Sequence, residues 1–397
     1  METLFTVIAV IFWLGGFALL FSRWILIFWR GLALLFGMFS KWRDFEIEKA
    51  PDRRVIVKKY VGSSKKVVVP KGATVIGEGA FAGKASIESI FFAAGLKTIE
   101  TGAFFQCVNL TQVRFSEGLE TIEAYAFSHS PIREVVLPSS LKKVESGAFS
   151  ICFAFAVSEG NANYVAQDGV LFTRDMSTLV RYPGGSDSKQ YSVPECVKRI
   201  AEESFSNSLF LRRLELPDNL EEIDDHAFLA CRLDEITIPA SVTKIGVGAF
   251  TRTGKIVVSE GNQKYFSTDD GVLFNFDLTL VSYPGGRGAR DYRVPDDTEH
   301  IEEKAFYYAM TLENVILPES LKSIGNQAFC GCKELTSVYV PNNVKDAVIS
   351  NPTAFENCPK LTNVKTFNPI EGRPFRARIF INDNGELKEK GDLGFFP

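Results

Sequence analysis

The chain has 397 residues and a mixed charge, with 44 Lys plus Arg against 48 Asp plus Glu and a net charge of −4. Nucleic-acid-binding domains usually carry an excess of basic residues, and this chain has none. We therefore expect no nucleic-acid partner. The length fits two or three ordinary domains, or a single repeat array in which each coil touches only its neighbours.

The chain begins with an apolar segment, residues 4–21, that carries no charge. Eighteen apolar residues are just enough to span a bilayer, and the leading Met-Glu-Thr lacks the basic region of a signal peptide. A second apolar segment, residues 24–39, is interrupted by Arg30. The sequence therefore predicts a membrane anchor over residues 1–43, with a transmembrane helix at 4–21 that precedes the repeats, and a membrane localisation.

Two arrangements of this anchor remain open. Residues 4–21 could span alone while 24–39 lie along the surface, or both segments could span as a hairpin. An arginine in mid-bilayer costs roughly 2.5 kcal/mol or more, which favours the first arrangement. A single span followed by basic residues would put the repeats on the cytoplasmic side, and a hairpin would put them outside.

Residues 44–70 predict an N-terminal capping hairpin. Two valine-rich runs, at 55–57 and 67–69, flank a turn signal at Gly62-Ser-Ser. The basic residues around this hairpin are interpreted as a solvated face, with contact to anionic lipid as the functional alternative.

A phenylalanine that follows a small residue, most often in Gly-Ala-Phe, recurs along most of the chain. The first four copies are separated by 23, 23 and 22 residues. A fixed period of this length is typical of a solenoid, whose units stack because none can bury its apolar face alone. The recurring phenylalanines are Phe81, Phe104, Phe127, Phe149, Phe205, Phe228, Phe250, Phe306, Phe329 and Phe355.

A longer period of 101 residues lies beneath the first and indicates an ancestral duplication. It relates Phe104 to Phe205 and the motif Tyr-Pro-Gly-Gly at 182–185 to the same motif at 283–286. Where the Phe spacing widens, near 158–190 and 259–291, each copy contains Ser-Glu-Gly and Asp-Gly-Val-Leu-Phe. We interpret each insert as a short hairpin followed by a glycine-rich turn.

Each coil is predicted to contain one strand that ends at a proline. In residues 211–217, Leu-Arg-Arg-Leu-Glu-Leu-Pro, the final Leu-Glu-Leu alternates as a half-buried strand should. Proline has no N–H for a ladder and ends the strand. The sequence predicts a solenoid over 71–366 and a C-terminal cap or tail over 367–397, where Asn384-Gly385 is a hairpin signal.

These repeats resemble the BspA-like leucine-rich repeats, whose coils read roughly LxxIxIPxxVxxIgxxAFxxC. Residues 238–250, Ile-Pro-Ala-Ser-Val-Thr-Lys-Ile-Gly-Val-Gly-Ala-Phe, are close to that string, and the resemblance covers about residues 55–366. It implies a right-handed coil with a parallel β-sheet on the concave face. It also implies binding or adhesion surfaces, favours the cell surface, and carries no shared chemistry.

The residue types that could act in catalysis or hold a metal form no catalytic or metal-binding pattern. Five of the seven cysteines lie three residues after a repeat phenylalanine, which indicates a small buried residue. The three histidines are scattered, and the Asp-Gly pairs of the inserts lack the further acidic ligands of a calcium loop. We therefore expect no enzyme activity, no cofactor, no metal and no small-molecule substrate.

A partner is expected to bind the strand side chains that point away from the core. By alternation this row also includes Val136, Thr237 and Ile316, and the two inserts are the alternative site. The polar candidates are Gln112, Arg114, Glu134, Arg213, Glu215, Glu235, Asn314, Ser337 and Tyr339.

The sequence thus predicts a membrane-anchored, non-enzymatic scaffold that binds a protein or a surface polymer. Two alternatives remain. One is a structural envelope component that self-associates, and the other is a glycan-active or enzyme accessory module.

Overall fold

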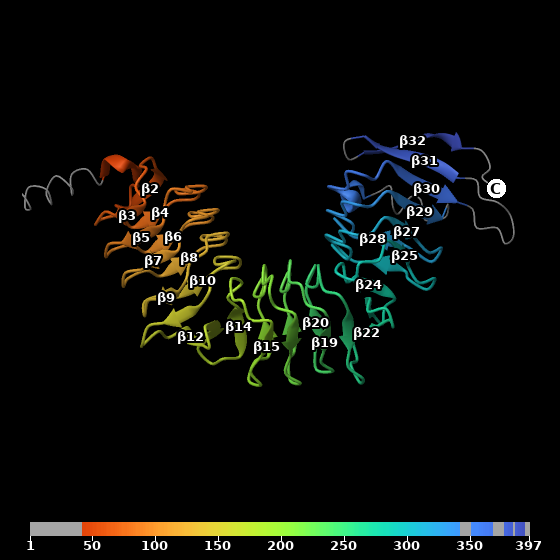
Figure 1. Cartoon of the computed structure of the whole chain (residues 1–397), viewed down its shortest axis with the longest axis horizontal. Helices are drawn as coiled ribbons and strands as arrows, with labels where there is room; N and C mark the ends of the chain where they lie inside the picture. The colour runs from red at the N-terminus through yellow and green to blue at the C-terminus, as the bar shows by residue number, and fades with distance from the viewer. Residues whose placement is uncertain (1–41, 342–350, 368–376, 384–385, 394–397) are drawn as a thin grey trace, which may run out of the picture.

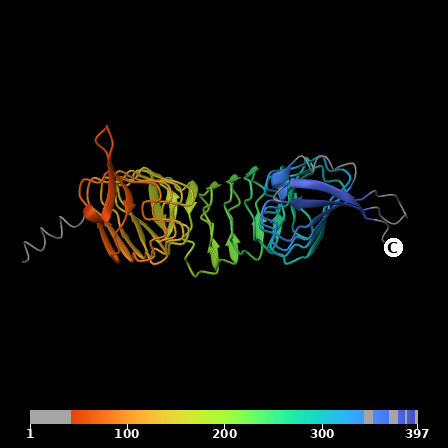
Figure 2. The ribbon, with the colours of Figure 1, turned by 90° about the horizontal axis from the view of Figure 1, so that it is seen from above.

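The computed structural model describes residues 42–341, 351–367, 377–383 and 386–393. Nearly all of them lie in coils of similar size, and the coils stack into an open arc (Figure 1). The first coils form one arm and the last coils form the other (Figures 1 and 2). The predicted repeat solenoid is therefore confirmed.

One side of the stack is built from the strands that the leucine pattern predicted. These longer strands are β3 (Lys66–Val69), β5 (Ser89–Phe92), β7 (Gln112–Arg114), β9 (Val135–Leu137), β11 (Phe155–Val157), β15 (Gln190–Ser192), β17 (Arg213–Glu215), β19 (Ile236–Ile238), β21 (Ile256–Val258), β25 (Asp291–Arg293), β27 (Asn314–Ile316), β29 (Ser337–Pro341) and β30 (Asn363–Phe367). Within separate short sheets they pair in parallel and in register, β3 with β5 and β7, β9 with β11, β15 with β17, β19 with β21, and β25 with β27, β29 and β30.

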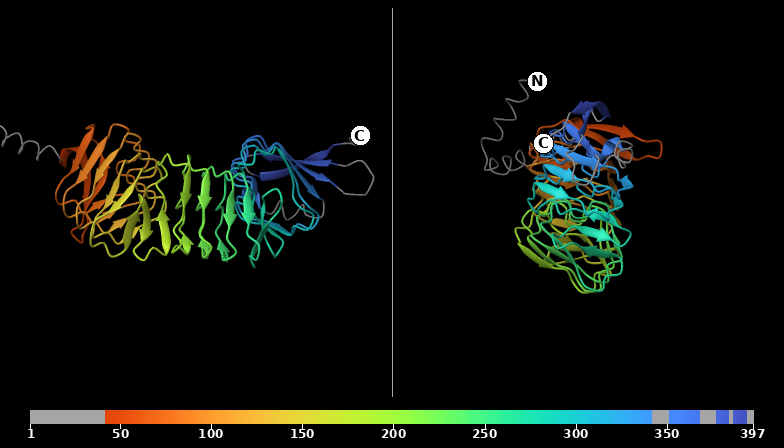
Figure 3. Two further views of the ribbon diagram at one scale, coloured as in Figure 1. Left: turned by 60° about the horizontal axis from the view of Figure 1, so that its bottom comes forward. Right: turned by 90° about the vertical axis from the view of Figure 1, so that its right-hand side faces the viewer.

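A second parallel ladder runs along another side of the coils in three sections that are interrupted at the inserts, and most of its strands have only two residues. Its members are β2 (Val55–Tyr60), β4 (Val75–Ile76), β6 (Thr98–Ile99), β8 (Thr121–Ile122), β10 (Lys143–Val144), β14 (Thr178–Arg181), β16 (Arg199–Ile200), β18 (Glu222–Ile223), β20 (Lys244–Ile245), β24 (Thr279–Ser282), β26 (His300–Ile301) and β28 (Ser323–Ile324). The two ladders and the turns between them enclose the core (Figure 3).

Stacked aromatic rings form the centre of that core. Successive repeat phenylalanines lie 4.4 to 5.3 Å apart between ring centroids, and a tyrosine stacks on the first phenylalanine of each series. This arrangement gives three aromatic columns. They are Tyr60–Phe81–Phe104–Phe127–Phe149, Tyr182–Phe205–Phe228–Phe250 and Tyr283–Phe306–Phe329–Phe355.

The small residue before each repeat phenylalanine, alanine everywhere except for Ser204 before Phe205, lets neighbouring turns approach closely. The Phe104 N–H donates to the Ala126 carbonyl at 2.7 Å, and the Phe205 N–H donates to the Ala227 carbonyl at 2.8 Å. The turns therefore form a third set of hydrogen bonds that links coil to coil and satisfies backbone groups next to the rings.

The two inserts begin a new column instead of extending the old one. β12 (Tyr164–Gln167) with β13 (Val170–Thr173), and β22 (Tyr265–Ser267) with β23 (Leu273–Asn275), form antiparallel hairpins. β13 and β23 then pair antiparallel with β14 and β24, which join the parallel ladder of short strands. We call the boundaries that these inserts create the first and second junctions.

The glycine pair of Tyr-Pro-Gly-Gly is required by close packing at each junction. A Cβ on Gly185 would lie 2.6 Å from the Ile151 carbonyl oxygen, and one on Gly286 would overlap the Arg252 carbonyl. The Gly185 N–H donates to Cys152 O at 2.8 Å, and the Gly286 N–H donates to Thr253 O at 3.0 Å. The motif therefore fits a new block against the last turn of the previous one.

The N-terminal cap differs from the hairpin expected around Gly62. After a 3₁₀ turn, η1 (Trp42–Asp44), strand β1 (Phe45–Lys49) pairs antiparallel with β2, while β2 and β3 join different ladders. The chain between them turns a corner of the first coil. At the other end, η3 (Pro352–Phe355) carries the last repeat phenylalanine, and β31 (Ala377–Asp383) and β32 (Glu386–Leu393) extend the sheet antiparallel from β30.

The predicted membrane localisation is contradicted. No helix among the described residues is both long and apolar enough to cross a bilayer. The segments that suggested a transmembrane helix and a membrane anchor, residues 4–21 and 24–39, lie outside the described residues. The anchor is therefore not supported.

Phe228→Ala should destabilise the second column. Phe228 is fully buried between Phe205 and Phe250, and removal of such a ring leaves a cavity that costs about 3–5 kcal/mol. Hydrogen exchange of the block that contains β17 to β20 would measure this loss. Phe210→Ala is the matched control because Phe210 is exposed, and equal protection in the two variants would contradict the role of the column.

Candidate binding surfaces

The predicted binding row lies on the ladder of longer strands. In β7 and β17 the central residue is buried and its two neighbours are exposed. Gln112, Arg114, Glu134, Arg213, Glu215 and Glu235 are exposed, Asn314 and Tyr339 are half-buried, and Ser337 is buried at 9 % exposure. Ser337 lies in β29, which pairs with β27 on one side and β30 on the other.

The structure divides this row into three groups rather than one continuous stripe. Gln112, Arg114 and Glu134 belong to the first block of coils. Arg213 and Glu235 form a parallel bridge in the second block, where the Ser192 hydroxyl donates to Glu215 at 2.5 Å. The third group contains Asn314, whose amide donates to Asp291 at 2.7 Å. The row is therefore a polar surface of mixed charge, and its position on the concave side stays a prediction.

The repeat cysteines act in hydrogen bonds between coils. The Cys107 Sγ donates to Phe81 O at 3.1 Å, and the Cys332 Sγ donates to Phe306 O at the same distance. Ser130 occupies the same repeat position and donates to Phe104 O at 2.8 Å. Burial raises the pKa of Cys107 to about 11, so the thiol stays protonated and able to donate. In the described ranges no group of His, Cys, Asp and Glu is placed to hold a metal.

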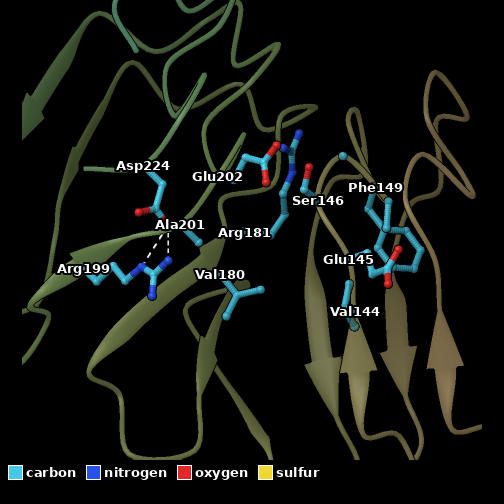
Figure 4. Close-up of a pocket in the computed structure, with 12 residues that line it drawn as sticks. Val144, Glu145, Ser146, Phe149, Val180, Arg181, Arg199, Ala201, Glu202 and Asp224 are labelled. Carbon is cyan, nitrogen blue, oxygen red and sulfur yellow. Dashed lines mark hydrogen bonds and ion pairs between the residues drawn. The ribbon is translucent and has the colours of Figure 1, made fainter. Parts of the chain in front are cut away.

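A pocket of about 230 Å³ lies at the first junction (Figure 4). Its lining comes from both blocks, with Glu145 on one side and Arg199, Glu202 and Asp224 on the other. Arg199 donates to Asp224 at 2.8 Å, as the dashed lines in Figure 4 show. Arg199 and Asp224 pair with each other and Glu145 pairs with Lys143, so most of the charged groups in this lining already have partners within the protein.

Arg181, which also lines this pocket, has a structural role at the junction. Its guanidinium is buried and donates at 2.8 Å to both Ser150 O and Ser206 O, at 3.0 Å to the Ser206 hydroxyl, and also to Glu203 O. Burial lowers the pKa of Arg181, but a guanidinium remains charged in proteins. One side chain thus joins the last turn of the first block to the first turn of the second.

A side-chain pair crosses the outside of each junction between positions 78 residues apart. At the first junction the Tyr125 hydroxyl donates to Glu203 Oε1 at 2.6 Å. At the second junction the Lys304 ammonium donates to His226 Nε2 at 3.2 Å. All four residues have positive φ angles, between 53° and 57°, which cost energy in residues other than glycine. Both pairs lie against a glycine of the intervening turn, Gly147 or Gly248.

A second pocket, of about 480 Å³, lies in the first insert. Its walls include the aromatic residues Phe153, Tyr182 and Tyr191, with Asp168 and Ser186 as polar neighbours. Phe153 is 50 % exposed, although most large apolar side chains of the coils are buried. Sequence reasoning named the inserts as an alternative site, with Tyr182 in the first and Asp168 interpreted as part of a turn, but it did not bring Phe153, Tyr191 or Ser186 to the site.

The sequence matches the BspA type leucine rich repeat region in six copies, over residues 59–156, 185–286 and 289–381. These segments cover most of the chain, so the protein belongs to this family. A comparison with curated proteins gave no match.

Solved structures of leucine-rich repeat proteins are among those to which this chain is similar. A leucine rich cell surface protein of Faecalibacterium prausnitzii is 20 % identical, with 81 % of this chain and 93 % of that chain covered and a TM-score of 0.39. A leucine-rich repeat protein of Eubacterium ventriosum is 21 % identical, with 80 % and 94 % covered and a TM-score of 0.47. The pneumococcal vaccine antigen PcpA is 21 % identical, with 81 % and 79 % covered and a TM-score of 0.37.

The second junction should lose stability in acid through His226. Burial, and then the positive charge of Lys304, lower the pKa of His226, while Glu203 and Asp225 oppose the shift. The folded state therefore binds fewer protons than the unfolded state below the ordinary histidine pKa of about 6.5. The free energy of unfolding that neutral, buried His226 contributes is therefore present above that pH and is lost as the pH falls.

The pH dependence of unfolding for His226→Gln, compared with the unchanged protein between pH 8 and pH 5, would measure this contribution. We expect a shallower loss of stability in the variant. His129→Gln is the control because His129 is exposed. The same slope in the His226 variant and the unchanged protein would contradict the assignment.

Proposed function

We propose that this protein is a non-enzymatic scaffold that binds a protein or a surface polymer through the side chains of its parallel strand ladder. The observation that carries the proposal is the exposed row on β7, β17 and the neighbouring strands. Family membership supports it, because BspA type repeats build extended surfaces from many similar coils.

The stacked core favours this use of the row. Ring stacking and in-register strands fix the spacing between coils, so the exposed side chains of successive coils are held in a regular order. A surface held rigidly before binding loses less conformational entropy when a partner docks. Affinity would then be spread over several coils instead of one deep site.

The exposed polar residues offer both signs of charge, which would set specificity more than affinity. Arg213, Glu215 and Glu235 lie close together in the second block. Tyr339, on the third group, supplies an aromatic side chain of the kind that often dominates binding energy. We propose Gln112, Arg114, Glu134 and Asn314 as further members of the row in the first and third groups, and Ser337, which is buried in the free protein, as the position that continues the row on β29.

The second candidate location is the first insert. The observation that favours it is the aromatic pocket around Tyr182 and Tyr191, since concave sites with a few polar groups are the usual places for ligand groups.

Replacing Arg213, Glu215 and Tyr339 together with alanine should weaken a bound ligand by at least about tenfold, since each such contact contributes on the order of 1 kcal/mol or more. The full chain would be immobilised and screened against purified proteins and polysaccharides, and the dissociation constant of each ligand found would be measured for both forms. Circular dichroism should be unchanged.

The matched control replaces Lys198, Glu221 and Lys322, which are exposed residues that precede short strands. Unchanged binding in the row variant, with loss in variants of the first insert, would show that the row is the wrong surface. Concentration-dependent sedimentation of the protein, with no ligand bound in the screen, would favour self-association instead.

A further inference from the structure

The two inserts share an aromatic pair in matching geometry. The Tyr182 and Tyr191 rings lie 5.1 Å apart at 54°, and the corresponding Tyr283 and Tyr292 rings lie 4.9 Å apart at 61°. The backbone of the following loop also corresponds, because the Ser186 N–H donates to Pro183 O at 2.9 Å and the Arg287 N–H donates to Pro284 O at 3.1 Å. Residues 186 and 287 therefore occupy equivalent positions.

In the second insert a guanidinium fills the space beside these rings. The Arg287 side chain lies 5.5 Å from the centroid of Tyr283 and 5.7 Å from that of Tyr292. Its Nη1 donates to Asp270 Oδ2 at 2.6 Å, and the side chain is 21 % exposed. Two aromatic faces and one carboxylate are a favourable environment for a planar cation. The second insert thus contains a complete internal complex of an aromatic pair, a carboxylate and an arginine.

The first insert keeps the pair and the carboxylate but not the arginine. Asp168 and Asp270 both open the Asp-Gly-Val-Leu-Phe motif, and Asp168 lines the pocket with Tyr182 and Tyr191. Ser186 occupies the position of Arg287, and because its side chain is much shorter, a pocket of about 480 Å³ remains beside the rings.

The pKa shifts of the two equivalent tyrosines also reflect the missing arginine of the first insert. Burial and then the carboxylate of Asp168 raise the pKa of Tyr191, and Asp270 acts in the same direction on Tyr292. Arg287 opposes that shift at Tyr292. Among the ion pairs of the described residues, Asp270 has Arg287 as its partner and Asp168 takes part in none.

We propose that the pocket of the first insert binds the guanidinium of an arginine side chain on a partner protein, in the manner in which the second insert holds Arg287. This inference rests on the proposed scaffold function and adds a defined contact to it. Arginine fits better than lysine because its planar group stacks on rings and pairs with a carboxylate at the same time. Phe153, which corresponds to Gly254 in the second insert, adds a further aromatic wall on the open side.

Binding of N-acetyl-arginine amide to the full chain, followed by calorimetry, tests the chemistry of the pocket. The uncharged citrulline analogue has nearly the same shape and should bind at least about tenfold more weakly, as should N-acetyl-lysine amide. Ser186→Arg should abolish binding because the new side chain would fill the pocket. Arg287→Ser should open the second insert and raise the stoichiometry from one to two.

Asp168→Asn provides a second test, should Ser186→Arg fail to fold, and we expect a loss of about tenfold or more. Equal binding of the arginine and citrulline compounds, or unchanged binding to Asp168→Asn, would overturn the proposal.

Peptides with a single arginine distinguish the source of the guanidinium. A peptide should bind more tightly than the amide and should lose that affinity when its arginine is replaced by citrulline. If only the small amide binds, the pocket takes a free guanidinium compound and the protein source is wrong. If a ligand of the row binds normally to Asp168→Asn, the scaffold function stands and this contact is not part of it.

Discussion

The stacking of aromatic rings between successive coils is the constraint on which this structure depends. A single coil has too little apolar surface to fold alone, so its stability comes from contact with the coils on either side. The repeat phenylalanine supplies that contact at 4.4 to 5.3 Å, close to the spacing of neighbouring β-strands, which is about 4.8 Å. Ring stacking and strand pairing therefore reinforce each other, and neither has to be distorted to satisfy the other.

The junctions show how the chain starts a new column without losing its continuity. A tyrosine takes the first place in each column, and the glycine pair behind it packs against carbonyl groups of the previous block. Arg181 adds hydrogen bonds across the first junction. At the second junction its place is taken by Ser282, and the protein there carries the His226–Lys304 pair. The two junctions are thus alike in backbone and different in the polar groups that could respond to solvent or ligand.

The coils could be predicted from the sequence because their signals are local and repeated. The 22- and 23-residue periods of Phe104, Phe127 and Phe149 fixed the stacking, and the alternation in Leu214-Glu-Leu216 fixed which strand residues face the core. The same evidence was weaker at the ends of the array. Val55-Ile-Val and Val67-Val-Val fit a hairpin as well as two sides of a coil, and only contact with β1 and β4 decides between them.

The candidate sites were harder to predict because they join distant residues. Tyr125 and Glu203 meet only because left-handed turns direct both side chains across the junction. The 101-residue period places Ser186 of the first insert at the position of Arg287 in the second. The role of this difference becomes clear only from the tyrosine pair that Arg287 contacts. Similarly, the residue after each Ser-Glu-Gly proves structural. Asn161 donates to Pro138 O and Leu141 O, and Asn262 repeats these bonds.

The division of the core into three aromatic columns also affects how the protein unfolds. Among the residues that the structure describes, the buried apolar side chains fall into three separate clusters, which divide near residues 171 and 272, close to the two inserts. A chain with three cores joined by hydrogen-bonded junctions need not unfold as one cooperative unit. Under a pulling force applied at its two ends, the arc would extend in discrete steps, one for each core. A partner that bridges a junction would couple two of these units and raise the force at which they separate.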